Sequence, residues 1–305
     1  MFRHIGKTAC NVFDTQVAAG LAGLPYPLSL SKLVQELAAA RLGKGLTFTH
    51  WDQRPLSAMQ LRYAADDVRY LPRVRAELRD RLEALGHAAW AAEECAALCD
   101  PGLYRFDPDT YYQRVRGATS LQPRNLAVLR ELTVWRDAAA REDDVPPRAF
   151  LKDEILLDLS RTPVKSVERL DRVRGLPRPV EKMHGQRIVE ATLRGMSTPA
   201  PDLPAARDVE PTPTERFRSD ALWAAAQVVC AGRSIDPALV LSRQDCGELY
   251  RALARGEKLD GLRVTNGWRA EALGRRLVQL YRTELELTLR WADGSLRIGD
   301  PGGPA

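Results

Sequence analysis

The fold is decided by residues 55–71, PLSAMQLRYAADDVRYL, which predict one helix. Ser57 and Gln60 form a capping box at its start, because their side chains satisfy two backbone amides that a helix leaves unpaired. Pro72 is expected to kink the helix, since proline removes one backbone hydrogen bond. Apolar residues recur at helical spacing and predict a buried stripe, made of Leu61, Ala64, Val68, Leu71, Leu78, Leu82 and Leu85.

Tyr63 and Asp67 lie about one turn apart on one face of this helix, because they are four residues apart. A phenol beside a carboxylate can hold a metal ion and align a water that attacks a phosphate. A solvated aspartate next to a half-buried tyrosine has the same spacing. The spacing alone leaves both interpretations open.

Three blocks of the sequence resemble ribonuclease D, a family of 3′-to-5′ exonucleases that use four acidic residues and a tyrosine. They lie in the family's order, at residues 13–19 (FDTQVAA), 51–56 (WDQRPL) and 63–71 (YAADDVRYL). Tyr63 and Asp67 match the family's third exonuclease motif, Tyr-x-x-x-Asp, residue for residue. The resemblance implies that Asp67 holds a metal ion and that Tyr63 hydrogen-bonds the attacking water.

The resemblance also implies that acidic residues are missing. The family's first two motifs supply an Asp, a Glu and another Asp, and both precede the residues that MFRHIG, at 1–6, matches. We therefore expect a chain truncated at its N-terminus, which carries one of four metal-binding acids. Asp14 is not expected to replace them, because Asp-Thr-Gln is structural in the family pattern. His50 stands where the family usually has Asp.

Residues 1–90 are expected to form the C-terminal part of a ribonuclease H-like α/β exonuclease domain. Residues 11–13 predict a short strand, and residues 15–23 predict a helix. A second helix is expected to stop at Gly43, on the spacing of Leu30, Leu33, Val34, Leu37 and Leu42. One strand alone makes no sheet, which agrees with truncation.

Residues 91–118 are predicted to be a connector, because Pro-Gly and Asp-Pro pairs within them are turn signals. Its aromatic residues can stack on bases or pin the connector to a domain surface, and both readings stay open. They are Tyr104, Phe106, Tyr111 and Tyr112.

An internal repeat occupies most of the remaining chain. Val145, Pro147, Leu151 and Leu159 recur 90 positions later as Ile235, Pro237, Leu241 and Leu249, and residues 185–189 recur 89 positions later. Two copies of one helical module, which differ by a single deletion, explain both shifts. The proline-rich residues 197–211 predict an extended linker, and the capping box TPTE at 212–215 follows it.

Each copy resembles the HRDC domain, a small helical module that RecQ-type helicases and ribonuclease D share. The resemblance assigns residues 119–196 to a first HRDC domain and residues 212–284 to a second HRDC-like domain. The expected fold is mostly α. In the tail, residues 285–305, apolar and polar residues alternate around Asp293-Gly294, which predicts a hairpin.

Cations are concentrated in the first copy. Between residues 161 and 194 stand nine Lys or Arg and four Asp or Glu, so this stretch carries the same net charge, +5, as the whole chain. Such concentration favours phosphate binding, although a solvated basic face is the alternative. The candidate nucleic-acid contacts are Arg172, Arg174, Arg178 and Lys182.

The composition excludes a membrane protein, because no apolar run approaches the roughly 20 residues that a membrane span needs. The five cysteines lack zinc-site spacing and indicate free thiols in a reducing cytoplasm. The sequence gives no sign of particular protein partners.

The resemblance implies an exoribonuclease that trims RNA 3′ ends, with tRNA precursors as the substrate and two Mg²⁺ or Mn²⁺ ions as cofactors. One alternative is a non-catalytic nucleic-acid-binding fragment that uses its HRDC modules. Another is a related DNA exonuclease, because Tyr-x-x-x-Asp does not discriminate the sugar. The tandem HRDC arrangement favours ribonuclease D.

Overall fold

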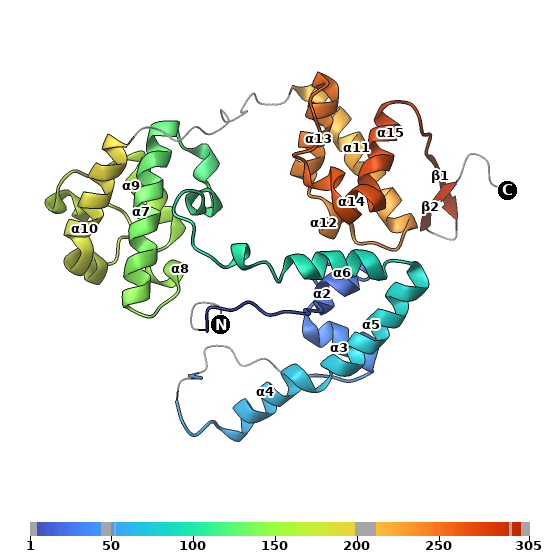
Figure 1. Ribbon diagram of the computed structural model, residues 1–305, viewed down its shortest axis with the longest axis horizontal. Helices are drawn as coiled ribbons and strands as arrows, with labels where there is room; N and C mark the ends of the chain where they lie inside the picture. Colours follow the sequence, from blue (N-terminus) through green and yellow to red (C-terminus); the bar gives the residue numbers. More distant parts are fainter. Residues whose placement is uncertain (1–4, 44–49, 52, 199–211, 293–294, 300–305) are drawn as a thin grey trace. The chain divides into compact units, whose positions relative to one another are not determined.

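The computed structural model describes residues 5–43, 50–51, 53–198, 212–292 and 295–299. The chain forms two compact units (Figure 1): Met1–Tyr104 together with Glu210–Ala305, and Arg105–Val209. Helices dominate both units, which confirms the mostly α prediction.

In the N-terminal part of the first unit, the regular elements among the described residues are all helices. Its elements are α2 (Thr15–Leu21), α3 (Leu30–Ala38), α4 (Ala58–Arg69), α5 (Leu71–Leu85) and α6 (Ala88–Ala97). Asp14 caps α2, since its Oδ1 accepts hydrogen bonds from the backbone N–H groups of Gln16 (2.7 Å) and Val17 (3.2 Å). This agrees with the structural role expected for Asp14.

Two local predictions for the residues before α4 are wrong. Residues 11–13 are not a strand, because Asn11 takes a left-handed conformation (φ 55°) that interrupts an extended run. The N–H of Asp14 instead donates to the Sγ of Cys95 on α6, at 3.3 Å. The helix α3 ends before Gly43, because Ala39 is left-handed (φ 51°).

The capping box of Ser57 and Gln60 is confirmed, with both reciprocal hydrogen bonds present. The predicted single rod is two helices, and α5 begins at Leu71, with Pro72 in its first turn. On α5, Leu78 and Leu82 of the predicted stripe are buried, together with Val74, whereas Leu85 is 39% exposed. On α4 the stripe prediction is wrong: Leu61 is 56% exposed and Val68 is 61% exposed. Helix α5 packs against α2 and α3, whereas these two positions of α4 face solvent.

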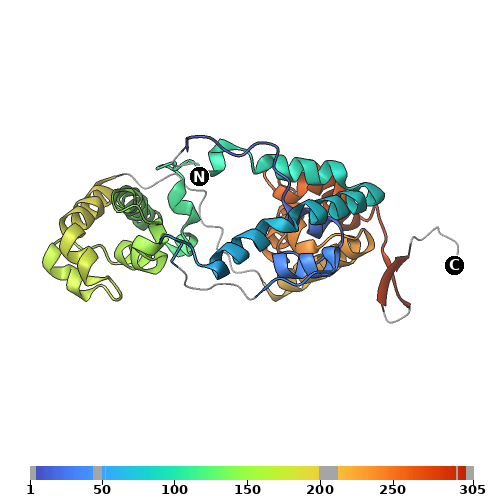
Figure 2. The same ribbon diagram turned by 90° about the horizontal axis from the view of Figure 1, so that it is seen from below.

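The second copy of the repeat completes the first unit. It contains α11 (Pro213–Gly232), α12 (Pro237–Val240), α13 (Arg243–Arg255), α14 (Gly267–Arg269), a π-helical segment (Ala270–Gly274) and α15 (Arg275–Tyr281). One hydrophobic core joins this copy to the N-terminal helices, and Leu21, Leu82 and Trp268 all belong to it. Figures 1 and 2 show the second copy, in orange and red, beside the N-terminal helices, and α6 contacts α14.

The second unit has its own core and consists of the first copy. Its main helices are α7 (Pro123–Glu142), α8 (Pro147–Phe150), α9 (Asp153–Arg161) and α10 (Arg178–Ser197). Short 3₁₀ turns stand at Tyr111–Arg114, Ala118–Ser120 and Val167–Arg172. The helices α7, α8 and α9 begin 90 residues before α11, α12 and α13, so the repeat predicted from sequence is present in the order of the elements.

The predicted connector, 91–118, is divided between the units. Its first residues belong to α6, which runs to Ala97, and its residues from Arg105 onward belong to the second unit. Tyr112 is 2% exposed in the core of that unit, so it pins the chain there. Tyr104 is 47% exposed, although its hydroxyl donates to the carbonyl of Leu98 at 2.7 Å.

The C-terminal hairpin is confirmed: β1 (Thr288–Ala292) pairs antiparallel with β2 (Ser295–Gly299), and Leu289 lies opposite Ile298. Its turn residues, 293–294, lie outside the described residues, as does most of the predicted linker, from 199 to 211. The capping box of Thr212 and Glu215 that follows the linker is confirmed.

Gly195→Ala is expected to destabilise the second unit by about 1–3 kcal/mol, the usual cost of overpacking. A Cβ at Gly195 would lie 2.5 Å from the Cα of Val128 and 2.9 Å from the carbonyl oxygen of Ala127, so α10 would have to move away from α7. Calorimetry of the whole chain measures the transition of this unit. The control is Gly261→Ala, because a Cβ there meets nothing within 4 Å. Equal midpoints for the two variants would contradict this packing.

Candidate active site and nucleic-acid surface

Tyr63 and Asp67 both lie on α4 and are both half-buried. The ring of Trp51 lies 5.8 Å from the ring of Tyr63, with the two planes tilted by 50°. The backbone carbonyl of His50 accepts a hydrogen bond from Nε2 of Gln60 at 3.0 Å, which ties the residues before α4 to its first turn. The second and third sequence blocks are therefore brought together around Tyr63.

The two adjacent carboxylates of α4 differ in their surroundings. Asp66 forms an ion pair with Arg69 at 3.3 Å, one turn later on the same helix. Among the described residues, no ion pair or hydrogen bond occupies the carboxylate of Asp67. Asp67 is thus the carboxylate of this pair that can accept a ligand.

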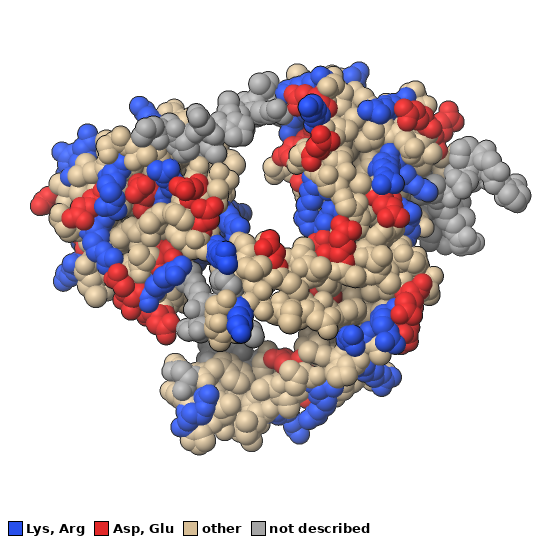
Figure 3. All heavy atoms as spheres, in the orientation of Figure 1, with Lys and Arg blue, Asp and Glu red and all other residues tan. Residues whose placement is uncertain are grey.

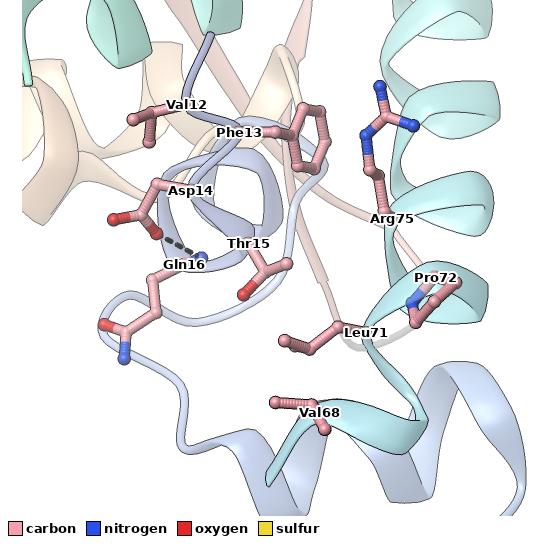
Figure 4. A pocket seen from close by; sticks show the side chains of 9 residues that line it. All are labelled: Val12, Phe13, Asp14, Thr15, Gln16, Val68, Leu71, Pro72 and Arg75. Carbon is pink, nitrogen blue, oxygen red and sulfur yellow. Dashed lines mark hydrogen bonds between the residues drawn. The ribbon is translucent and has the colours of Figure 1, made fainter. Parts of the chain in front are cut away.

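A pocket of about 720 Å³ lies beside the end of α4 and brings the first and third blocks together. Its lining consists of Val12, Phe13, Asp14, Thr15, Gln16, Val68, Leu71, Pro72 and Arg75 (Figure 4). The guanidinium of Arg75 lies 5.5 Å from the centre of the Phe13 ring, a cation–π contact. Nothing in the sequence pattern indicated Arg75, because its partner comes from a distant block. Asp14 faces this pocket, but its Oδ1 caps α2.

Metal binding is implied by the exonuclease family, and the described residues supply part of what it needs. Asp67 fits as one oxygen ligand. Within the described ranges, no group of three or more His, Cys, Asp or Glu side chains lies close enough to hold a metal ion. Since Mg²⁺ requires several oxygen ligands in near-octahedral geometry, these residues do not complete a site by themselves.

The cysteines are free thiols, as predicted. Burial raises the pKa of both Cys230 and Cys246 to about 12. They are therefore protonated at neutral pH and are poor nucleophiles.

The four candidate nucleic-acid contacts lie together at the start of α10 in the second unit. Arg172 ends the preceding 3₁₀ turn, and Arg174 precedes Gly175, whose φ of +80° makes the turn into α10. Arg178 is the first residue of α10, and Lys182 follows one turn later. All four are exposed. Figure 3 shows Lys and Arg side chains gathered over α10, with some acidic side chains among them.

Ion pairs separate the nine cations of this stretch into two groups. Four of them pair with acids: Arg161 with Asp158 (3.5 Å), Arg178 with Glu181 (2.9 Å), Arg187 with Glu142 (2.7 Å) and Arg194 with Glu131 (3.4 Å). The other five form no ion pair within the part of the chain that the structure describes. They are Lys165, Arg169, Arg172, Arg174 and Lys182. The structure thus adds Lys165 and Arg169 to the candidates and gives Arg178 a partner.

In the part of the chain that the structure describes, no helix is long and apolar enough to cross a bilayer.

Comparison with known proteins gives consistent matches. Residues 1–83 match the family described as 3′-5′ exonuclease, and residues 125–192 match the HRDC domain. A relative named Ribonuclease D from Gluconacetobacter diazotrophicus is 37% identical over 274 residues, which are 88% of this chain and 67% of the relative. A second Ribonuclease D, from Granulibacter bethesdensis, is 34% identical over 92% of this chain and 71% of its own.

Solved structures agree with these matches. The chain is similar to Escherichia coli RNase D, described as an exoribonuclease involved in structured RNA processing, with a TM-score of 0.73 and 26% identity. That similarity covers 93% of this chain and 76% of the E. coli chain. A Bifidobacterium adolescentis protein shares the fold at a TM-score of 0.59.

Proposed function

The chain belongs to the ribonuclease D family, and we propose that it trims RNA 3′ ends, with tRNA precursors as the substrate class. The observation that carries this proposal is the face of α4, where Tyr63 and Asp67 match the family motif and Asp67 lacks an ion-pair partner among the described residues. We also propose a cytoplasmic location, which the free thiols support.

In this proposal Asp67 provides one oxygen ligand to a divalent ion, Mg²⁺ or Mn²⁺. Such ions activate a water and stabilise the leaving oxygen in phosphodiester hydrolysis. The hydroxyl of Tyr63 would orient the attacking water, and the ring of Trp51 packs beside the Tyr63 ring. Arg69 neutralises Asp66, which leaves Asp67 as the less engaged carboxylate of the pair.

RNA would be held through its phosphates by the exposed cations at the start of α10. Lys and Arg beside the sugar–phosphate backbone bind without reading bases. We propose that residues 119–196 and 212–284 are two copies of one module in this enzyme, because their helices follow the same order.

The test is a trimming assay with two proteins. The first is residues 1–305 alone, and the second carries at its N-terminus the segment of the G. diazotrophicus relative that precedes the matched region. With Mg²⁺ or Mn²⁺ we expect the second protein to shorten a 5′-labelled RNA one nucleotide at a time. We expect the first to bind the RNA without appreciable trimming, because its described residues bring one carboxylate to the site.

Two outcomes would overturn this function. One is a folded chimera that binds RNA and metal but never shortens the RNA. The other is faster trimming of single-stranded DNA than of RNA, which would favour a DNA exonuclease. The first outcome would favour the non-catalytic nucleic-acid-binding alternative.

A further inference from the structure

The second copy of the repeat contacts α6 through the half-buried carboxylate of Glu94. Glu94 accepts two hydrogen bonds from the guanidinium of Arg269, at 2.6 and 2.7 Å, and one from Nε1 of Trp268 at 2.8 Å. Arg263 donates a further bond at 3.2 Å. The side chains of Glu94 and Arg269 are only 16% and 8% exposed. This pair is therefore a charge-assisted, two-pronged contact, the strongest class of hydrogen-bonded pair.

Glu94 is held here as an anion. Burial by itself would raise the pKa of Glu94, but the hydrogen bonds from Arg269 and Trp268 and the charges of Arg269 and Arg263 lower it below the ordinary value. The carboxylate is accordingly bound in its charged form at neutral pH.

Neighbouring residues of α6 take part in the same contact. Trp90 stacks on Trp268 with ring centres 6.3 Å apart, and its Nε1 donates to Glu271 at 3.1 Å. The N–H of Trp268 donates to Glu93 at 3.1 Å. The residue before it, Gly267, has a φ of +53°. A Cβ on Gly267 would collide with the carboxylate of Glu93, which would have to move away from the backbone N–H of Trp268.

The repeat identifies the residues of the first copy that correspond to the α6-contacting residues of the second copy. Helices α10 and α14 begin 89 residues apart. At this shift, Arg172, Arg174, Arg178 and Lys182 of the first copy correspond to Gly261, Arg263, Gly267 and Glu271 of the second. Three of the four cations are therefore replaced, and the fourth, Arg263, binds Glu94. Of the replacements, Gly267 and Glu271 make the contacts with α6 described above.

We propose that the face of the second copy which corresponds to the cationic face of the first is a docking face for α6. Glu94 occupies the place that a phosphate would take on the first copy. The two copies thus have a division of work. The cationic face of the first copy binds RNA, and the corresponding face of the second copy binds α6 of the exonuclease segment. The docking half of the proposal is independent of RNA, and the other half rests on the proposed RNA binding.

The first experiment compares two corresponding arginines in the 305-residue chain. Arg174→Gln and Arg263→Gln each remove one positive charge, and both side chains can be changed without opening a core. Affinity for a short labelled single-stranded RNA is measured by fluorescence anisotropy at about 0.1 M salt. Each lost phosphate contact costs about fivefold in affinity under these conditions. We expect that loss for Arg174→Gln and less than half of it for Arg263→Gln.

The second experiment measures docking without RNA. Glu94→Gln keeps the shape of the side chain but leaves Arg269 buried without its counter-charge. We expect the thermal midpoint of the first unit to fall by on the order of 10 °C. The matched control is Glu77→Gln on α5, which removes an exposed i,i+4 ion pair with Arg81 and should leave the midpoint within about 2 °C. Arg263→Gln should lower the midpoint by an intermediate amount, and it keeps the test decisive if Glu94→Gln fails to fold.

The outcomes separate the two halves of the proposal. If Arg263→Gln weakens RNA binding as much as Arg174→Gln does, the division of work is overturned. If Glu94→Gln is as stable as Glu77→Gln, the docking face is overturned. If neither arginine matters for RNA while Glu94→Gln is destabilised, docking stands and RNA binding at the first copy fails.

Discussion

Asp67→Asn is expected to remove most trimming activity from the chimera that carries the upstream segment. The change replaces a charged oxygen ligand by a neutral amide. Metal ions contribute several kcal/mol of transition-state stabilisation in such reactions, and each 1.4 kcal/mol is a factor of ten in rate. The expected loss is therefore on the order of a hundredfold or more. Single-turnover trimming of a labelled RNA measures it, and Mn²⁺ titration measures the accompanying loss of metal affinity.

Asp66→Asn is the matched control, because the two carboxylates are adjacent on α4 and Asp66 is engaged by Arg69. Its rate should stay within about threefold of the parent, as expected when only an exposed i,i+3 ion pair is lost. Similar rates for the two variants would remove Asp67 from the mechanism. Tyr63→Phe, which keeps the contact with Trp51, should lower the rate without changing Mn²⁺ affinity.

The second large effect is a loss of RNA affinity. We expect it when the cations that have no acidic partner among the described residues are replaced. Arg172→Gln combined with Arg174→Gln should weaken RNA binding about 25-fold at 0.1 M salt, since two phosphate contacts are lost. The slope of log K against log salt should flatten by about 1.4, at 0.7 per contact on a single strand. Anisotropy titrations at several salt concentrations give both values. Arg178→Glu should have a smaller effect, because Glu181 already engages Arg178.

The control for the Arg172→Gln and Arg174→Gln double variant is a second double variant with the same change in net charge. Arg161→Gln combined with Arg194→Gln removes two cations of the same stretch that form ion pairs, with Asp158 and Glu131. That variant should keep the parent slope of log K against log salt, because the two replaced arginines form ion pairs in the absence of RNA. Equal slopes for the two double variants would mean that the stretch is a solvated basic face. Changing the base sequence of the RNA should alter neither result, because phosphate contacts do not read bases.

Local sequence determined the starts of several helices and the periodicity of the chain. Ser57 with Gln60, and Thr212 with Glu215, form capping boxes whose bonds span three residues, so the pattern alone contains the information. The repeat was visible for a similar reason: one helix order produces one spacing of apolar residues, and the shift of 90 reappears in the first helices of the two copies. The hairpin followed from Asp-Gly between alternating strands.

The candidate site was predicted only in part. Tyr63 and Asp67 came from a motif within one helix, and their shared face follows from helical spacing. Helical spacing also accounts for the engaged carboxylate, because Asp66 lies three residues before Arg69 and Asp67 only two, a separation at which side chains do not face each other. The nine cations between residues 161 and 194 are different: partners such as Glu131 and Glu142 lie on another helix and decide which charges are engaged.

Tertiary structure alone decided the features that depend on distant neighbours. The apolar positions of α4 match a buried stripe in spacing, yet Leu61 and Val68 are exposed, because burial requires a packed partner and periodicity only permits one. Residues 11–13 have strand-like composition but no neighbouring strand in the described chain. The contact of Glu94 with Arg269 joins residues 175 positions apart. No local pattern encodes such a pair, because its energy arises only when the fold removes both charges from water together.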